Sequence, residues 1–247
     1  MTATPALVSI ARRLRDDVSE LRFGGSVGHV YNPLTYAWAP HREYLERYGR
    51  GQRSVLIVGM NAGYFGMAQT GVPFGDVEMV REWLAIERPV ERPKDQHPKR
   101  PIEGFSCRRH EVSGQRLWGW ARDTFDAPER FFAHFFVLNY CPLCFLAKGG
   151  ANLALDKLPV ASRKRLFAAC DRAIAAAADA LKIRHAIGLG RFAAERVVTI
   201  LGDTTICGRA PHPSPANARV GQNWANEMNR ALAAMGIRVP RQIMADA

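Results

Sequence analysis

The stretch at residues 55–76, VLIVGMNAGYFGMAQTGVPFGD, decides how the rest of this chain is read. Its first four residues are all aliphatic, which predicts a strand buried on both faces of a sheet. Asn61 and several glycines follow, and glycine lets a backbone adopt positive φ and approach a ligand closely. Open α/β sheets bind ligands where their strands end. Because this loop has few charges before Asp76, it favours a pocket for a flat, neutral, polar ligand.

Three further apolar runs, at residues 135–138, 185–189 and about 204–207, predict three more strands. Helical patterns lie around them, at about 5–22, 76–86, 113–125, 159–181, 191–201 and 223–235. Strands that alternate with helices indicate an α/β fold, whose short, mainly parallel four-stranded central sheet is covered on both faces. We expect one domain over residues 1–247, with the N-terminal helix packed on it.

Two segments do not fit this alternation. Residues 29–49 are rich in aromatic side chains and are interrupted by Pro33 and Pro40, so we interpret them as a strap packed across the sheet. An aromatic wall near the site is the alternative. Residues 88–109 are charged and rich in proline, which predicts a surface excursion that is either solvated or facing DNA.

Polar side chains follow three of the predicted strands. Asn61 and Asn139 stand directly after buried runs, and His212 lies in Pro-His-Pro-Ser-Pro after the last strand. Prolines restrict the backbone around this imidazole, which makes it a better catalytic candidate than an ordinary histidine. The three residues include no strong base, and the chain shows neither a nucleophile elbow nor a carboxylate pair for ordinary glycoside hydrolysis. Chemistry here would depend on positioning and electrostatics.

The composition suggests a polyanionic partner. Lysine and arginine number 34 against 23 acidic residues, which gives a net charge of +11. Such an excess favours nucleic acid, although a solvated basic surface would explain it too. Arginines within the first twenty residues argue against a signal peptide, and no run is long enough to span a membrane. Five cysteines without even spacing suit a reducing compartment. We therefore expect an intracellular protein, in the cytoplasm (nucleoid) of a bacterium or the nucleus of a eukaryote.

Two short motifs have competing interpretations. Gly188 and Gly190 begin a partial dinucleotide fingerprint, but no acidic residue follows where a ribose partner would stand, so helix–strand packing or phosphate binding at Arg191 is favoured over NAD. Cys141 and Cys144 have the spacing of metal ligands, but a zinc site usually needs four, so buried thiols are the better interpretation. We expect no metal and no cofactor.

Longer motifs resemble the single-strand-selective monofunctional uracil-DNA glycosylases, a family within the uracil-DNA glycosylase superfamily. The resemblance spans about residues 29–235 and is closest in GMN at 59–61, FGMAQTGVPFG at 65–75, HPKRP at 97–101, EVSG at 111–114 and HPSP at 212–215. It implies a three-layer α/β/α sandwich that removes uracil, and some 5-substituted uracils, from DNA. Apart from Lys99 in HPKRP these motifs contain no lysine, and none stands next to Asn61, Asn139 or His212 to form a Schiff base, so we expect base removal without strand cleavage.

The resemblance also implies roles for individual residues. Asn61 would hold the attacking water, and His212 would hydrogen-bond the uracil O2. Asn139 would read the polar edge of the base, Phe74 would stack on it, the Met60 backbone would contact it, and Gly63 would leave space beside C5. The residues implied to contact DNA are Lys148, Gly149, Gly150, Asn152, Arg163, Ser214, Pro215, Ala216, Asn217 and Arg219.

Ala62, Tyr64 and Ala216 depart from the family pattern, which leaves the preferred lesion open. Tyr64 would narrow the C5 side of the pocket or add a hydrogen bond to it. The alternatives are a specificity shifted to deaminated purines and a damaged-DNA-binding protein without catalysis. The expected partner is DNA, single- or double-stranded, and the expected state is a monomer.

Overall fold

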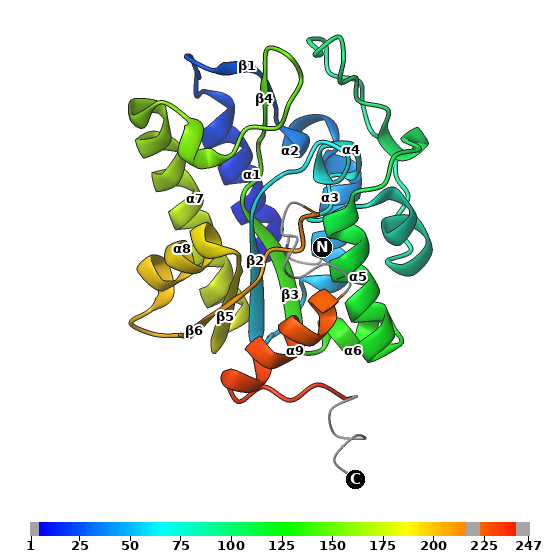
Figure 1. The fold of residues 1–247 in the computed structure, drawn as a ribbon, viewed down its shortest axis with the longest axis vertical. Coiled ribbons are helices and arrows are strands. Elements are labelled where there is room, and N and C mark those ends of the chain that lie inside the picture. The colour runs from blue at the N-terminus through cyan, green and yellow to red at the C-terminus, as the bar shows by residue number, and fades with distance from the viewer. Residues whose placement is uncertain (1–4, 216–222, 241–247) are drawn as a thin grey trace.

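Four parallel strands form the central sheet of the computed structural model, which describes residues 5–215 and 223–240. The order is β3-β2-β5-β6, and the bounds are β2 (Val55–Asn61), β3 (Phe135–Cys141), β5 (His185–Leu189) and β6 (Ile206–Ala210). Because all four strands run in one direction, their carboxyl ends lie at the same edge (Figure 1). This arrangement confirms the predicted α/β class and the four-stranded parallel sheet.

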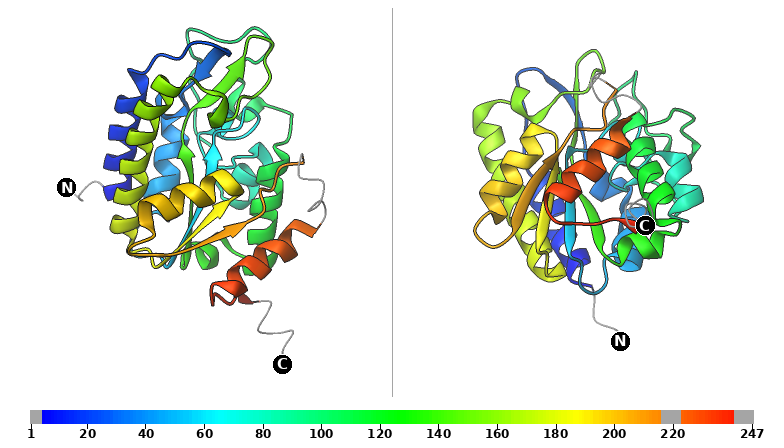
Figure 2. Two further views of the ribbon diagram at one scale, coloured as in Figure 1. Left: turned by 60° about the vertical axis from the view of Figure 1, so that its left-hand side comes forward. Right: turned by 60° about the horizontal axis from the view of Figure 1, so that its bottom comes forward.

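Helices cover both faces of the sheet, as Figure 2 shows. One face is covered by α7 (Val160–Leu181) and α8 (Arg191–Leu201), and α1 (Ala6–Ser19) packs on α7. The other face is covered by α5 (Val112–Phe125), α6 (Pro128–Phe132) and α9 (Trp224–Ala234). The short elements are α2 (Pro33–Tyr36), α4 (Met67–Thr70), the π-helical η1 (Met79–Trp83), and the 3-10 helices η2 (Gly104–Ser106) and η3 (Leu155–Lys157). Within the described ranges, no helix has the length and apolar character needed to cross a membrane.

The apolar run at the start of β2 lies at the centre of the core. Residues 55–58 are at most 1% exposed, as expected for a strand with neighbours on both sides and helices on both faces. The edge strand β3 is protected by α3 (Trp38–Tyr48), where Tyr44 donates its hydroxyl to the Val137 carbonyl at 2.9 Å. Covering an edge in this way satisfies its backbone and prevents further strand pairing.

Most of the strap predicted at residues 29–49 is helical. Asn32 caps α2 through the Leu34 N–H, with Pro33 at the first helical position, and Pro40 lies in the first turn of α3. Proline is tolerated at these positions because their N–H groups have no intrahelical acceptor. The tyrosines of this segment are buried, and Tyr36 donates its hydroxyl to the Ala68 carbonyl. They contribute to the core rather than to an open aromatic wall.

Two other expectations need correction. The helix expected over residues 76–86 is shorter: residues 77–83 are helical, mostly as the π-helical η1, with Asp76 accepting from the Met79 N–H, and Ala85 then has a positive φ of 50°. The chain also forms an unexpected antiparallel pair, β1 (Val27–Tyr31) with β4 (Cys144–Ala147). This pairing joins segments more than 100 residues apart, so no local pattern announced it. The last sheet strand begins at Ile206, two residues later than expected.

Candidate active site

The ends of β2 and β3 bring an amide and an aromatic ring together. Gly59 of β2 is the register partner of Asn139 in β3. A Cβ added at Gly59 would lie 2.5 Å from both Asn139 Oδ1 and Phe74 Cζ. Glycine at this position therefore makes room for the Asn139 amide and the Phe74 ring to lie over the strand. Asn139 Nδ2 also contacts Met67 Sδ at 3.3 Å.

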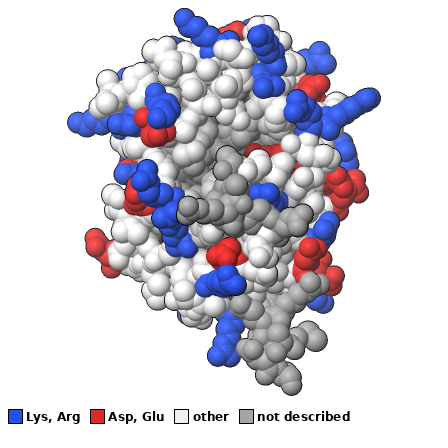
Figure 3. Space-filling view, viewed as in Figure 1, with Lys and Arg blue, Asp and Glu red and all other residues white. Residues whose placement is uncertain are grey.

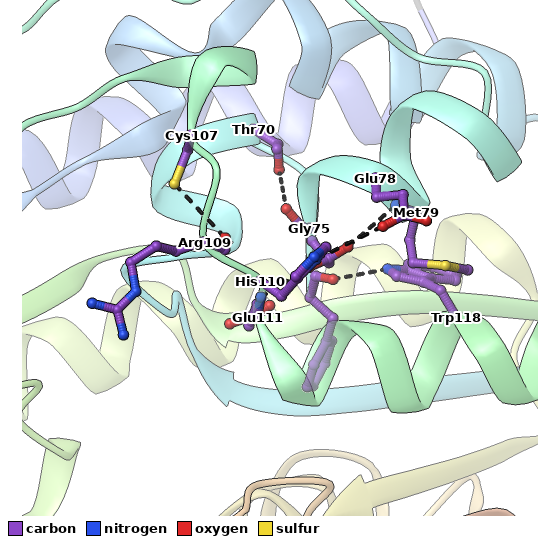
Figure 4. A network of polar contacts seen from close by, with 11 residues as sticks. Thr70, Gly75, Glu78, Met79, Cys107, Arg109, His110, Glu111 and Trp118 are labelled. Carbon is purple, nitrogen blue, oxygen red and sulfur yellow. Dashed lines mark hydrogen bonds and ion pairs between the residues drawn. The ribbon is translucent and has the colours of Figure 1, made fainter.

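The loop after β2 is tightly held where it carries Phe74. Phe74 adopts a positive φ of 52°, which is uncommon for a bulky residue and marks a constrained position. The indole of Trp118 donates to the Phe74 carbonyl at 3.0 Å and also contacts the Pro73 carbonyl. The Thr70 hydroxyl donates to the Gly75 carbonyl at 3.0 Å (Figure 4). These contacts from α4 and α5 fix the ring that was predicted to stack on a base.

His212 lies directly beyond β6, beside the Phe74 ring, with the two ring centroids 6.3 Å apart. The Ser214 N–H donates to His212 Nδ1 at 3.0 Å. Burial lowers the pKa of His212, so the ring is neutral at pH 7. With Nδ1 accepting, the single ring proton is on Nε2, which is then a hydrogen-bond donor.

Contacts from three other elements hold the His212 loop. Arg116 of α5 donates through Nη1 to the carbonyls of Pro213, at 2.9 Å, and Ser214, at 3.2 Å. Trp224 donates its indole N–H to the Pro211 carbonyl at 2.8 Å. Gly190, with φ of 86°, passes so close that a Cβ there would lie 3.2 Å from His212 Cβ. The imidazole therefore has a defined position at the edge of the sheet.

Asn61 is the last residue of β2 and directly precedes the glycine-rich loop. Its Nδ2 donates to the Ala62 carbonyl at 3.2 Å, while no described residue donates to Oδ1. Met60 and Asn61 are half-buried, so this end of β2 is accessible from the site. The residues gathered here are two amides, one aromatic ring and one neutral imidazole. They suit a flat polar ligand without charge.

Gly63 and Tyr64, which were both predicted to border the base, have different surroundings. Next to Gly63, where a side chain would project, lies the Glu111 carboxyl, with Oε1 at 2.0 Å from the ideal Cβ position. Tyr64 is 4% exposed and donates its hydroxyl to the Pro101 carbonyl at 2.6 Å. That hydroxyl is therefore engaged by the 88–109 excursion rather than offered to a ligand.

The residues predicted to contact DNA lie on a turn and a helix near the site. Lys148, Gly149 and Asn152 are exposed in the turn after β4. This turn is tied to the 88–109 excursion, because Arg100 donates to the Gly150 carbonyl at 2.8 Å. Lysine and arginine side chains gather along the upper edge of the face in Figure 3. Arg163 lies in the first turn of α7; Ser214 and Pro215 follow His212, and Ala216, Asn217 and Arg219 lie outside the described residues.

The motifs with competing interpretations have structural explanations. A Cβ at Gly188 would lie 2.2 Å from the Ala194 backbone, so this glycine allows α8 to pack closely on β5. Cys141 and Cys144 are buried free thiols, and burial raises the pKa of Cys144. Asp76, close to Glu78 and His110, accepts from the backbone N–H groups of Met79 and Glu111. Its carboxylate is thus used to hold the start of η1 and α5.

Sequence reasoning missed several residues that shape this site. Gly59 and Arg116 act on it only through partners distant in the chain, at Asn139 and at Pro213. Glu111 and Trp118 lie at the start and middle of α5 and contact the loop after β2. Glu111 did stand within a motif of the family resemblance, but its spacing to the other candidates gave no sign of a role.

Known proteins are similar to this chain over most of its length. The model of the uracil DNA glycosylase superfamily matches residues 46–235. The single-strand selective monofunctional uracil DNA glycosylase of Mus musculus is 44% identical over 228 residues, which cover 91% of this chain and 82% of the relative. The protein of the same name from Bos taurus is 43% identical, over 91% and 84% of the two chains.

A solved structure supports the fold independently. The crystal structure of wild-type Pedobacter heparinus SMUG2 superposes with a TM-score of 0.61 at 17% identity, covering 96% of this chain and 99% of that one. Together with the motifs at the ends of β2, β3 and β6, the matches show that this chain belongs to the uracil-DNA glycosylase superfamily, in the family of the single-strand-selective monofunctional uracil-DNA glycosylases.

Proposed function

We propose that this enzyme hydrolyses the N-glycosidic bond of uracil in DNA, and of 5-substituted uracils such as 5-hydroxymethyluracil, and leaves an abasic site without cutting the strand. The observation that carries the proposal is the convergence of Asn139, Phe74 and His212 beside the end of β2. The names of the relatives support uracil as the base. The finer statements on substituents and strand cleavage go beyond those names.

The target base would leave the DNA stack and enter the site. Unstacking a base costs a few kcal/mol, which contacts in the pocket must offset. The Phe74 ring replaces part of the lost stacking, and the Asn139 amide pairs with the polar edge of the base. An amide offers a donor to O4 and an acceptor to N3–H of uracil, whereas cytosine presents the opposite pattern. The site therefore discriminates against cytosine.

Bond cleavage separates an anionic uracil from a cationic sugar. In the proposed mechanism the His212 Nε2–H donates to O2 of the base, where negative charge develops as the bond breaks. A neutral donor that is already in place costs no reorganisation during the reaction. Asn61 Oδ1 accepts a hydrogen bond from the water that attacks C1′ of the sugar. The water oxygen bonds to C1′, the base leaves with the bonding electron pair, and solvent takes the surplus proton.

The absence of strand cleavage follows from the proposed contacts. A lyase reaction needs an amine that forms a Schiff base with the sugar. The residues proposed to contact the base or the attacking water are two asparagines, a phenylalanine, a histidine, a methionine and a glycine, and none has an amine. One chain supplies all these groups, so we also propose that a monomer is sufficient.

The test is base release from end-labelled single-stranded DNA with one uracil, with half of each sample treated with hot alkali. We expect a break only after alkali. The variant Asn61→Ala should lose base release by at least about 100-fold, because it removes the group that orients the water. DNA binding should survive in this variant. Asn226→Ala, which changes an exposed amide on α9, is the matched control and should retain activity.

Other results would change the assignment. A break before alkali would show lyase activity and contradict the monofunctional mechanism. Retained activity in Asn61→Ala would remove Asn61 from the mechanism. If the wild-type protein binds uracil-containing DNA but releases neither uracil, 5-hydroxymethyluracil, hypoxanthine nor xanthine, the binding-only alternative is correct.

A further inference from the structure

Glu111 is a half-buried acid with an enclosed carboxyl oxygen, and the mechanism above has no use for it. It stands at the N-cap of α5, yet its side chain makes no capping hydrogen bond. Its backbone N–H is already held by Asp76 Oδ2 at 2.8 Å. Its Oε2 is enclosed and has no hydrogen-bond partner among the described residues. Such a group costs free energy unless something pairs with it, so its retention calls for an explanation.

The carboxyl lies against the glycine-rich loop that follows Asn61. A Cβ at Gly63 would lie 2.0 Å from Oε1, and a Cβ at Gly66 would lie 2.0 Å from Oε2. Two glycines therefore make room for one carboxyl. The family resemblance implies that position 63 borders C5 of the base. The space that a side chain at 63 would fill is occupied by Glu111 Oε1, so the carboxyl itself borders this part of the pocket.

The surroundings keep this carboxyl neutral. Burial, together with the smaller effect of the nearby Asp76 charge, raises the pKa of Glu111 to about 8. The other polar group close to it is the buried Cys144 thiol of β4. His110, beside Glu111 in Figure 4, contacts Asp76 Oδ2 at 3.1 Å, and the Arg109 guanidinium lies over the Phe65 ring. At pH 7 the carboxyl thus holds a proton and has one donor as well as an acceptor.

We propose that Glu111 is a specificity-determining residue of the base pocket, whose carboxyl hydrogen-bonds a hydroxyl-bearing substituent at C5 of uracil. This inference rests on the proposed function. A 5-hydroxymethyl group has one donor and one acceptor, which match those of the carboxylic acid. The methyl group of thymine has neither and would cover the acid with an apolar group. A site built to pair with a hydroxyl rejects the analogue that lacks it, because its own polar group is then left unsatisfied.

The test compares kcat/KM for uracil and 5-hydroxymethyluracil in otherwise identical single-stranded DNA. Glu111→Leu, of similar volume but apolar, should lower the ratio of 5-hydroxymethyluracil to uracil excision by roughly 10-fold or more. Glu111→Gln should keep most of the ratio, since its amide still donates and accepts while remaining neutral. Glu78→Leu is the matched control, because this acid is exposed beside the same cluster, and it should leave the ratio unchanged.

A second measurement uses only the wild-type protein and Glu111→Gln. It therefore remains informative if Glu111→Leu fails to fold. The 5-hydroxymethyluracil preference of the wild-type protein should fall as pH rises above about 8 and the carboxyl loses its donor. Glu111→Gln should show no such fall, because its amide does not titrate in this range.

The outcomes separate this inference from the proposed function. Equal losses on both bases in Glu111→Leu, with pH profiles that coincide in wild type and Glu111→Gln, would reduce Glu111 to a structural role. A wild-type protein that excises uracil but not 5-hydroxymethyluracil would overturn the inference and leave uracil excision standing. A protein that excises neither base would overturn the proposed function as well.

Discussion

His212 shows how single contacts determine the chemistry of a side chain. Its free pKa would leave an appreciable fraction of the ring charged near neutral pH. Burial lowers the pKa, and the Ser214 N–H at Nδ1 selects the tautomer with its proton on Nε2. A neutral donor stabilises a developing anion without first binding the ground state through a full charge. The Ser214 backbone thus fixes the tautomer opposite to the one that a carboxylate selects in many other enzymes, because it donates to Nδ1 instead of accepting from it.

Gly59 provides a prediction at the same scale. The change Gly59→Ala puts a methyl group 2.5 Å from Asn139 Oδ1 and the Phe74 ring, so both groups must move. We expect kcat/KM for uracil excision to fall by about 10-fold to 100-fold, since small displacements of positioning groups have effects of this size. Steady-state kinetics on a uracil-containing oligonucleotide would measure this.

Gly119→Ala is the control for that substitution, because no atom lies within 4 Å of a Cβ at Gly119 in α5. Alanine is the better helix former by about 1 kcal/mol, so this variant should be fully active and slightly more stable. Unchanged activity in Gly59→Ala would mean that Asn139 and Phe74 do not contact the base in the reactive complex.

The element that most affects the site is the loop after β6. It lies at the edge of the sheet, yet its position is determined by helices from other parts of the chain. Arg116 of α5 reaches two of its carbonyls, and Trp224 at the start of α9 reaches a third. The proline-rich sequence of this loop limits its conformations, but the contacts from α5 and α9 orient it toward Phe74.

Removing the Arg116 contacts should affect the positioning of His212 more than the binding of the DNA substrate. Arg116→Ala leaves the carbonyls of Pro213 and Ser214 without this charged donor, and such a hydrogen bond is typically worth about 1.5–3 kcal/mol. We expect kcat to fall by roughly 10-fold with a smaller change in KM, and Arg116→Lys to recover part of the loss.

The matched control is Arg122→Ala on the same helix, where the arginine side chain, within the described part of the chain, forms its ion pair with the exposed neighbour Asp123. It should keep wild-type kcat. If Arg116→Ala and Arg122→Ala had the same kcat, the loop would hold His212 in place without Arg116.

At the scale of the whole molecule, the relevant feature is the excess of basic side chains and where they lie on the surface. The net charge of +11 favours a polyanion, and two exposed lysines lie on segments that hydrogen-bond each other. Lys148 follows β4 and Lys99 lies in the excursion that hydrogen-bonds the same turn. The excursion also accepts a hydrogen bond from Tyr64 in the loop after β2, so we expect DNA bound along this surface to present a base to the pocket.

Salt dependence tests this placement of DNA. Lys148→Ala removes one cation from the proposed surface, so the slope of log K against log salt for single-stranded DNA should become shallower by about 0.7. Arg184→Ala is the control, because this exposed arginine precedes β5 at the opposite edge of the sheet. Fluorescence anisotropy at several salt concentrations would measure both slopes. Equal slopes for wild type and Lys148→Ala would remove the turn after β4 from the DNA interface.

The sequence by itself determined the features that depend on neighbouring residues. A continuous apolar run at residues 55–58 is enough to identify a buried strand, and glycines with a terminal asparagine are enough to mark a ligand-binding loop. Local patterns also predicted Asn139, which follows an apolar run, and His212, which stands between prolines, as site residues. Because parallel strands end at one edge, their meeting in the fold followed from the strand directions alone.

Only the tertiary structure decided what depends on contacts between distant segments. Tyr64 stands in the middle of the predicted pocket loop, yet its hydroxyl binds the Pro101 carbonyl in the 88–109 excursion. Glu111 lies 48 residues after Gly63 in the sequence, yet its carboxyl fills the space beside that glycine. A side chain's direction and its ionisation depend on what packs around it, and burial by segments far along the chain leaves no mark in the local pattern.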